Sequence, residues 1–415
     1  MDIARFRSLR HRNYRLFFTG QGISLVGTWM QQIAMSWLVY RMSGSALLLG
    51  VVAFSGRIPT LLLGPFAGVL ADRVNKHRLI VITQTLSMIQ AFVLSALVLT
   101  GTVAIWQVIA LSFILGCVNA FDIPIRQAFV VDMIERKEDL GNAIALNSSL
   151  VNGARLVGPA IAGILIAALG EGLCFLVNGI SYLAVIIALL MMKMGKPVIK
   201  AGEKHFIREL AEGFSYAFGF SPIKSILLLL ALMSFLGMPY QVLMPIFAGK
   251  VLHGGPHTLG FLMGASGLGA LAGAIFLASR KDTVQLGMIT PLAAAIFGIG
   301  LMAFSGSRVL WLSMPLISLA GFGMMVQMAS SNMVLQNIVE DSKRGRVMAL
   351  FTMAFMGMTP FGSLTAGWLA SRIGAPYTTF ISGVCCVLGS LVFSIRLPSL
   401  KEKLAPVYEK KRFQI

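Results

Sequence analysis

The sequence predicts an all-α polytopic membrane protein with twelve transmembrane helices, and three features of the chain predict it. Of its 415 residues, 57% are hydrophobic and only 12% are charged, about half the charged fraction of a soluble domain. Uncharged runs recur along the chain, for example at residues 79–100 and 173–192. Each run is about long enough for a helix to cross ~30 Å of hydrocarbon.

The third feature is the placement of the basic residues. If the N-terminus is cytoplasmic, 27 of the 34 Lys and Arg residues fall in cytoplasmic segments. Four fall on the outer side, and Arg57, Arg126 and Arg155 fall within spans. This is the positive-inside pattern, so the net charge of +18 indicates topology and attraction to anionic lipid, not nucleic-acid binding. We expect a multi-pass protein of a cell membrane, the bacterial inner membrane, with both termini cytoplasmic.

Span length and apolar content place twelve helices in the chain. They are expected at residues 14–40, 45–70, 79–100, 104–133, 141–169, 172–193, 222–248, 257–279, 285–305, 309–338, 346–371 and 376–396.

These spans divide into two groups of six. We expect an N-terminal bundle at residues 1–193, a cytoplasmic connector at 194–221 and a C-terminal bundle at 222–396. The second half of the connector, about 206–220, has the pattern of an amphipathic helix on the cytoplasmic face. The tail at 397–415 is expected to be solvated and partly disordered.

The two halves resemble each other weakly but regularly. Gly116 is matched by Gly321 at an offset of 205, and GNAIAL at 141–146 is matched by GRVMAL at 345–350. Gly158 then corresponds to Gly362 at an offset of 204, and Gly163 likewise to Gly367. A duplicated six-helix unit is typical of secondary transporters, which bind their substrate near the membrane midplane. The alternative is a chance alignment of glycine-rich apolar helices.

A charged pair lies deep in the fourth predicted span, within NAFDIPIRQAFVVDMI at 119–134. At 1.5 Å per residue, Asp122 lies roughly 20 Å from the cytoplasmic end of the helix, near the midplane. Arg126 follows on the same helix face, and Pro124 frees a backbone carbonyl between them. A lone charge at this depth costs at least ~2.5–3.5 kcal/mol, so both should face the protein interior or a wet cavity. Two interpretations stay open: a proton-coupling pair in which Asp122 takes and releases a proton, or a structural, self-neutralising pair.

The loop after the second span, GVLADRVNKHR at 68–78, resembles the signature loop of the major facilitator superfamily. Asn75 replaces a glycine of that signature, and we expect it to keep the turn because Asn tolerates left-handed backbone. Asp72 can accept hydrogen bonds at a neighbouring helix N-terminus, and Asp132 is the natural partner of Arg73. We expect a cytoplasmic gate formed by Gly68, Asp72, Arg73, Arg78 and Asp132. The alternative, plain positive-inside anchoring, explains Lys76 and Arg78 but not Asp72.

The fifth span carries GARLVGPAIAG at 153–163, which is similar to a Gly-Pro motif associated with exporters of this superfamily. Gly158 and Gly163 allow close helix packing, and Pro159 sets a kink. With NYRLFFTGQGISLVGTWMQQIAMSWLVY at the start, the resemblance covers nearly the whole chain. The sequence resembles the enterobactin-exporter and macrolide-efflux-like branch of drug:proton antiporters, which implies the major facilitator fold of two pseudo-symmetric six-helix bundles.

The spans also offer polar side chains for a substrate cavity, because a polar group in hydrocarbon must face water or protein. Gln31 is expected there as well, and methionines such as Met324 and Met353 form a soft wall that can repack around varied ligands, unless they only fill the core. The expected cavity residues are Gln21, Trp29, Gln32, Arg57, Arg155, Gln241, Gln327 and Asn332.

The sequence has no nucleotide-binding Gly-x4-Gly-Lys-Ser/Thr loop and no HExxH spacing. We therefore expect no enzyme activity, no cofactor and no metal site. The expected function is proton-coupled export of a siderophore-like or amphipathic drug-like solute by alternating access, by a monomer whose partners are solute, protons and lipid. The alternative is an importer or uniporter in which the Asp122–Arg126 pair is structural. A membrane scaffold without transport is a third possibility, which the three embedded arginines argue against.

Overall fold

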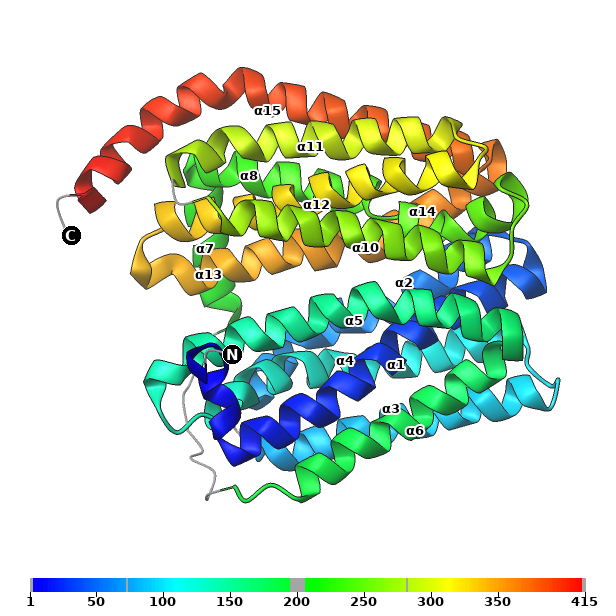
Figure 1. Cartoon of the computed structure of the whole chain (residues 1–415). Coiled ribbons are helices and arrows are strands. Elements are labelled where there is room, and N and C mark those ends of the chain that lie inside the picture. Colours follow the sequence, from blue (N-terminus) through cyan, green and yellow to red (C-terminus); the bar gives the residue numbers. More distant parts are fainter. Residues whose placement is uncertain (1–2, 72–73, 195–205, 281–282, 413–415) are drawn as a thin grey trace. The chain divides into compact units, whose positions relative to one another are not determined.

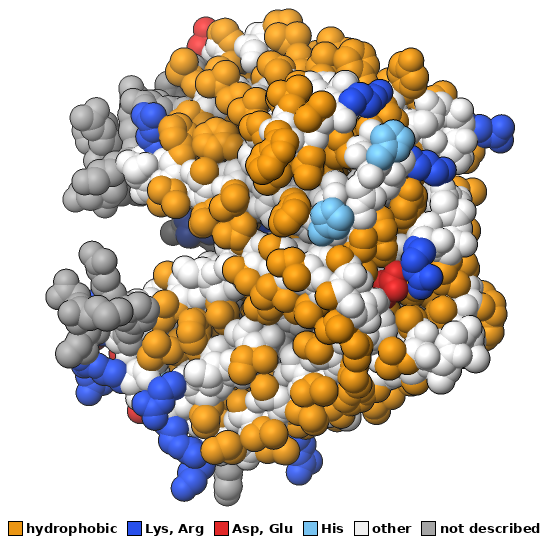
Figure 2. Space-filling model, turned by 45° about the vertical axis from the view of Figure 1, so that its right-hand side comes forward, with side chains coloured by type: hydrophobic (Ala, Val, Ile, Leu, Met, Phe, Trp, Pro, Cys, Tyr) orange, Lys and Arg blue, Asp and Glu red, His pale blue; other side chains and the backbone are white. Residues whose placement is uncertain are grey.

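The computed structural model describes residues 3–71, 74–194, 206–280 and 283–412, and the regular elements in these ranges are helices (Figure 1). Eleven of the helical segments described are long and apolar enough to cross a membrane. Helix α1 (Arg12–Ser43) is not among them, because its glutamines and arginines dilute its apolar content. Hydrophobic side chains cover much of the visible surface (Figure 2), as expected of a protein surrounded by lipid.

The chain forms two compact units. Unit 1 comprises Met1–Glu203 and His253–Gly264. In it α1 packs against α5 and α6, α3 against α4 and α6, and α2 against α4. Its elements are η1 (Ile3–Arg10), α1, α2 (Ala46–Ala71), α3 (Lys76–Leu99), α4 (Ile105–Asp132), η2 (Lys137–Asp139), α5 (Leu140–Leu169), α6 (Glu171–Leu190) and the start of α10 (Pro256–Ala278).

Unit 2 comprises Lys204–Leu252 and Ala265–Ile415. Three of its segments are π-helical: η3 (Met233–Gly237), η4 (Phe247–Val251) and η5 (Met353–Gly357). The α-helices of this unit are α7 (Phe206–Gly219), α8 (Ser221–Leu232), α9 (Tyr240–Ile246), the rest of α10, α11 (Thr283–Gly306), α12 (Leu310–Ile338), α13 (Asp341–Thr352), α14 (Met358–Ile373) and α15 (Ala375–Arg412).

Each predicted span coincides with a helix or a run of helices, with ends that mostly agree within a few residues. The predicted connector helix is present as α7, and it docks on α13. Glu212 of α7 pairs with Arg346 at 3.0 Å, and the Lys343 ammonium lies 4.2 Å from the Tyr216 ring centroid. The basic start of α13 therefore holds the acidic and aromatic side chains of α7.

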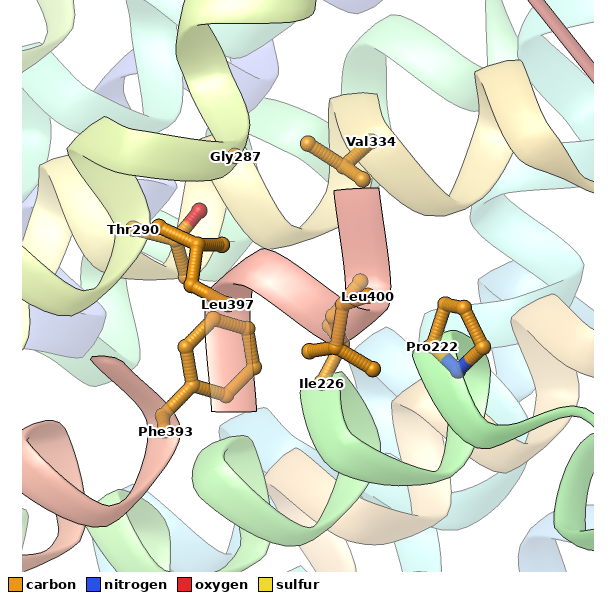
Figure 3. Close-up of a pocket in the computed structure, with 8 residues that line it drawn as sticks. All are labelled: Pro222, Ile226, Gly287, Thr290, Val334, Phe393, Leu397 and Leu400. Atoms are coloured by element: carbon orange, nitrogen blue, oxygen red, sulfur yellow. The ribbon is translucent and has the colours of Figure 1, made fainter. Parts of the chain in front are cut away.

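The expectation of a partly disordered tail is wrong for residues 397–412, which continue α15 as one helix. The reason is a row of apolar side chains at helical spacing, Phe393, Leu397 and Leu400. They line a small pocket whose other walls come from α8, α11 and α12 (Figure 3). Leu400 is only 3% exposed, so its burial holds this part of the helix against unit 2.

The glycines of the internal repeat have equivalent packing roles in the two units. A Cβ atom added to Gly116 of α4 would lie 2.5 Å from the Gly56 carbonyl oxygen of α2. A Cβ added to Gly321 of α12 would lie 2.1 Å from the Ser266 carbonyl oxygen of α10. Both are far closer than van der Waals contact, so only glycine fits. Equivalent contacts at equivalent places support a duplicated unit over a chance alignment.

The second pair of repeat glycines behaves in the same way. Gly158 of α5 meets α1, where an added Cβ would lie 2.5 Å from the Trp29 Cβ. Gly362 of α14 meets η3, where the Phe235 carbonyl oxygen would lie 2.1 Å away. A glycine of α5 therefore packs directly on α1 in unit 1, and a glycine of α14 packs directly on η3 in unit 2.

Candidate functional site

Asp122 is buried in the core of unit 1 and is surrounded by hydrogen-bond donors. Its residue is 2% exposed, and its Oδ2 lies 2.6 Å from Nη2 of Arg126, one turn later on α4. Its Oδ1 accepts hydrogen bonds from Thr83 Oγ1 at 2.7 Å and Gln84 Nε2 at 2.8 Å. One guanidinium and two neutral donors replace the water that a carboxylate loses on burial.

Thr83 and Gln84 were not among the residues singled out from the sequence. Both lie on α3, and polar residues on a transmembrane helix were the available signal. Their distance of about 40 positions from Asp122 gave no indication of contact. Because α3 packs against α4, the two side chains reach the carboxylate from the neighbouring helix. The pair predicted from the four-residue spacing is present, and α3 completes it.

The three embedded arginines have different surroundings. Arg126 pairs with Asp122, and 22% of its side chain is exposed. Arg155 of α5 lies over the Trp29 ring of α1, with 5.8 Å between the guanidinium carbon and the ring centroid, a cation–π contact. Arg57 of α2 is partly buried and takes part in an interaction. Two predicted cavity residues, Arg155 and Trp29, are therefore in contact with each other.

Gln31 does not face a cavity, contrary to expectation. Its Nε2 donates to Gln90 Oε1 of α3 at 2.9 Å, and its Oε1 accepts from Asn178 Nδ2 of α6 at 2.6 Å. Ser181 then donates to Asn178 Oδ1 at 3.1 Å. These buried side chains connect three helices by hydrogen bonds, which is how polar groups are satisfied inside a membrane bundle.

Replacing Gln31 by methionine should destabilise unit 1, because it removes two interhelical hydrogen bonds and leaves Asn178 and Gln90 with unmatched groups. Interhelical hydrogen bonds in membranes contribute about 0.6–1.7 kcal/mol each, so we expect a loss of about 1–3 kcal/mol. The matched control is Gln32→Met, because Gln32 is exposed. Thermal unfolding can be followed with a thiol-reactive dye that detects buried Cys174. Equal unfolding midpoints for the two variants would contradict the structural role of Gln31.

The remaining polar candidates differ in exposure. Gln21 is 2% exposed and its Oε1 has no hydrogen-bond partner. In unit 2, Gln241 is partly buried and donates to the Tyr240 hydroxyl at 3.4 Å, and Asn332 accepts from Gln336 one turn later. Gln327 is buried and donates to Ser331 at 3.2 Å.

The Gln327–Ser331 pair is the counterpart of Asp122–Arg126. The repeat offset of 205 that relates Gly116 to Gly321 also relates Asp122 to Gln327 and Arg126 to Ser331. In each pair the two residues are four apart on one helix, α4 in unit 1 and α12 in unit 2. Unit 2 therefore keeps the hydrogen-bonded geometry without any charge, and the ionisable version occurs in unit 1.

Helix α5 carries an exposed polar face, of which only Arg155 was singled out from the sequence. Ser148 and Ser149 are exposed, and Asn152 and Arg155 are partly exposed. Asn152 donates to the Ser148 carbonyl at 2.9 Å, so its side chain is satisfied within its own helix. Spacing of i, i+4 and i+7 in NSSLVNGAR was the available signal. Polar groups exposed on a membrane-spanning helix indicate a water-filled space.

Part of the predicted gate can be placed. Asp72 and Arg73 lie outside the described residues, and of Gly68 only the backbone, inside α2, is described. Asp132 is paired with Lys76 at 2.8 Å. Arg78 is exposed. Lys76, which was not among the predicted gate residues, is therefore a partner of the carboxylate.

Asn75 does not adopt the left-handed backbone that we expected. Its φ is −69° and its ψ is 102°, and its side chain accepts a hydrogen bond from the backbone N–H of Arg78 at 3.1 Å. Asn75 is therefore the N-cap of α3. A side chain that satisfies the helix start explains asparagine here without any positive φ.

The Gly-Pro motif of α5 packs on both sides. Gly158 and Pro159 are buried, and Gly158 meets Trp29 as described above. A Cβ on Gly163 would lie 2.9 Å from the Gly260 Cα atom, in the part of α10 that belongs to unit 1. The motif gives α5 two smooth surfaces for close helix packing. Among the described residues, no group of three or more His, Cys, Asp or Glu side chains is placed to hold a metal.

Comparison with known proteins agrees with this architecture. The family described as transmembrane secretion effector matches residues 3–413. The staphyloferrin A transporter of Staphylococcus aureus is 29% identical over 400 residues, covering 94% of this chain and 98% of the relative. Macrolide efflux protein A of Streptococcus pyogenes is 23% identical, covering 92% and 96%. The multidrug efflux pump Tap of Mycobacterium tuberculosis is 26% identical, covering 93% and 92%.

Solved structures show the same fold at low identity. A bacterial homologue of the human lysosomal transporter Spinster superposes with a TM-score of 0.72 at 12% identity, covering 97% of this chain and 98% of that one. A bacterial homologue of the iron transporter ferroportin superposes with a TM-score of 0.69 at 17% identity, covering 93% and 98%. The chain belongs to the transmembrane secretion effector family of the major facilitator superfamily, and it is a multi-pass membrane transporter.

Proposed function

We propose that this transporter is a proton-coupled exporter of a siderophore-like or amphipathic drug-like solute, working by alternating access. The names of three relatives support the solute class: a staphyloferrin A transporter, a macrolide efflux protein and a multidrug efflux pump. We further propose that α1 is a twelfth span and that residues 1–193 and 222–396 form two pseudo-symmetric six-helix bundles. The connector at 194–221 and both termini are then cytoplasmic, in a bacterial inner membrane, and the protein acts as a monomer.

The observation that carries this proposal is the buried Asp122–Arg126 pair. A carboxylate that is 3% exposed and 2.6 Å from a guanidinium changes its surroundings strongly when it gains a proton, because the charge attraction disappears. Arg126, which is partly exposed, is then released to turn toward an anionic solute. Protonation of Asp122 therefore changes how strongly Arg126 is held, which couples the proton to a solute that binds Arg126. The neutral Gln327–Ser331 pair gives unit 2 no equivalent titration.

The cavity walls follow from charge and exposure. In unit 1, Arg155, Trp29, Gln32 and the polar face of α5 form a cationic wall, to which Arg57 and Gln21 contribute after rearrangement. In unit 2 the wall is softer and uncharged, formed by Gln241, Gln327, Asn332 and neighbouring methionines. The side chains of each unit, taken by itself, suit a bulky amphipathic or anionic solute.

The gate remains part of the proposal. Gly68, Asp72, Arg73, Arg78 and Asp132 form a cytoplasmic latch, with Lys76 holding Asp132 in place. Gly158, Pro159 and Gly163 provide the packing surfaces on which α5 moves.

The test is solute-driven proton movement in proteoliposomes that contain an internal pH dye. Staphyloferrin A and a macrolide are the two probes. For the wild type, addition of a transported probe should move protons in the opposite direction, and Asp122→Asn should abolish this movement. The matched control is Glu171→Gln, because Glu171 is also a buried carboxylate paired with an arginine, Arg41 at 2.7 Å, but it lies at the start of α6.

The alternative function, an importer or uniporter with a structural Asp122–Arg126 pair, predicts a different outcome. Probe flux would then proceed without proton movement and would be indifferent to an imposed pH gradient. Proton movement that persists in Asp122→Asn would remove Asp122 from the mechanism.

A further inference from the structure

The contacts of Thr83 have a feature that the ion pair alone does not explain. Its hydroxyl oxygen lies 2.7 Å from Asp122 Oδ1 and 2.9 Å from the backbone carbonyl oxygen of Ile80, within its own helix. Both distances are those of a hydrogen bond. A hydroxyl has one hydrogen to donate and two lone pairs to accept with. Thr83 therefore has two acceptors for a single hydrogen.

We propose that Thr83 is a two-position hydroxyl switch that stabilises Asp122 in both of its protonation states; this rests on the proposed proton coupling at that carboxylate. When Asp122 is ionised, Thr83 donates its hydrogen to Oδ1. When a proton binds to Oδ1, the new O–H donates to Thr83 Oγ1, and Thr83 turns its own hydrogen to the Ile80 carbonyl. One O–H bond forms on Asp122, one hydrogen bond is replaced by two, and no other covalent bond changes.

Gln84 has the chemistry to adapt in the same way. Its Nε2 donates to Oδ1 at 2.8 Å, whereas its Oε1 is buried and has no hydrogen-bond partner. The amide N–H group of Gln84 thus donates a hydrogen bond while its carbonyl oxygen accepts none, as expected beside an ionised carboxylate, which can only accept. A protonated carboxyl group has a single hydrogen, so while it donates to Thr83, Gln84 keeps its own donor on Oδ1, and rotation of the amide would offer an acceptor only in place of Thr83. The α3 side of the site thus consists of two groups that can each donate or accept, which a lysine or arginine could not do.

The charged and titratable groups around the site are few. On α4 itself, Arg126 is the partner of Oδ2. On α6, Tyr182 interacts electrostatically with both Asp122 and Arg126, and its hydroxyl lies 3.5 Å from Thr28 of α1. Helix α2 carries Arg57 next to Gly56, which meets α4 at Gly116. From α3 the contacts to the carboxylate are the uncharged Thr83 and Gln84. Proton binding on Oδ1 therefore leaves Arg126 bonded to a neutral group, which holds it less strongly.

The test measures protonation of Asp122 directly and needs no solute. In the purified full-length protein, the carbonyl stretch of a protonated carboxyl group is followed by infrared difference spectroscopy as pH is varied. The band that disappears in Asp122→Asn belongs to Asp122. In Thr83→Val its titration midpoint should rise by about one pH unit, because the lost hydrogen bond to a charged group is stronger than the lost bond to a neutral one. Thr83→Ser should restore the wild-type midpoint.

The position of the band separates a switch from a fixed donor. A protonated carboxyl group that has lost its acceptor absorbs at higher wavenumber, so the Asp122 band should move upward in Thr83→Val. The matched control is Thr85→Val, which removes a hydroxyl bonded to the Val81 carbonyl of the same helix at 2.8 Å without touching Asp122. If Thr83→Val does not fold, Thr83→Ala gives the same comparison with less side chain.

Three outcomes decide the matter. A raised midpoint with a shifted band supports the switch, and it does so whether or not solute flux moves protons. An unchanged midpoint in Thr83→Val overturns it, and a raised midpoint with an unmoved band reduces Thr83 to a one-way donor and also overturns it. The Asp122 band can also titrate as expected while solute flux is unaffected by pH and by Asp122→Asn. In that case the proposed exporter function is contradicted and the switch is not.

Discussion

Replacing Arg126 by methionine is expected to lower the stability of the protein by about 3–5 kcal/mol, the usual cost of removing one partner of a buried ion pair. Methionine matches the length of the arginine stem but supplies no charge. Asp122 would then be a buried carboxylate with only Thr83 and Gln84 as donors. The deficit should shrink as pH falls, because protonation removes the unpaired charge. Thermal unfolding at several pH values measures both effects.

The control for this prediction is the double variant Arg126→Met with Asp122→Asn. Asparagine keeps an oxygen that can accept hydrogen bonds from α3 and carries no charge, so the double variant should be more stable than Arg126→Met alone. Asp122→Asn by itself should cost less than Arg126→Met, because the guanidinium that it leaves unpaired is 22% exposed, whereas the carboxylate left by Arg126→Met is 3% exposed. If the double variant is the least stable of the three, the unpaired charge is not the source of the cost.

Replacing Gly321 by alanine is expected to destabilise unit 2. The added methyl carbon would lie 2.1 Å from the Ser266 carbonyl oxygen, so α10 and α12 must move apart. Overpacking of this kind costs about 1–3 kcal/mol. Gly116→Ala, with 2.5 Å to the Gly56 carbonyl oxygen, should cost less but act at the equivalent place in unit 1.

Each unit contains its own matched control. A Cβ on Gly64 of α2 or on Gly287 of α11 would meet no heavy atom within 4 Å. Alanine at such positions should be neutral or stabilise by about 0.4–1 kcal/mol, because it restricts the unfolded chain. A thiol-reactive dye can compare the variants, since Cys174 is buried in unit 1 and Cys386 in unit 2. Equal midpoints for Gly321→Ala and Gly287→Ala would contradict the close approach of α10 and α12.

Much of the fold was predictable from local pattern. Span boundaries followed from apolar run length, and the helices begin and end near the predicted positions. The tail after Leu397 was misjudged, because its charged residues suggested solvation while the spacing of Phe393, Leu397 and Leu400 continued one helix face. The π-helical segments η3, η4 and η5 had no sequence signal that we recognised.

The site was predictable only where its residues are close in sequence. Asp122 and Arg126 are four residues apart, so helix geometry alone placed them together. Lys76 was not identified as the partner of Asp132, because several cations of the same loop were equally near in sequence. Gln31 was assigned to a cavity because a polar side chain in a membrane span needs a hydrogen-bond partner. The sequence does not say whether that partner is water or a neighbouring helix.

The sequence by itself determined the membrane class, most of the helix positions and the buried charge pair. Hydrocarbon penalises an unpaired charge, and a helix needs a long apolar run to cross it, so local composition records both. Tertiary structure decided which helix faces which, and therefore that Thr83 and Gln84 complete the carboxylate site while Gln31 is tied to Gln90 and Asn178. The physical reason is that packing of side chains and interhelical hydrogen bonds determine which membrane helices associate. Which side chains meet across two helices cannot be read from the sequence of either helix.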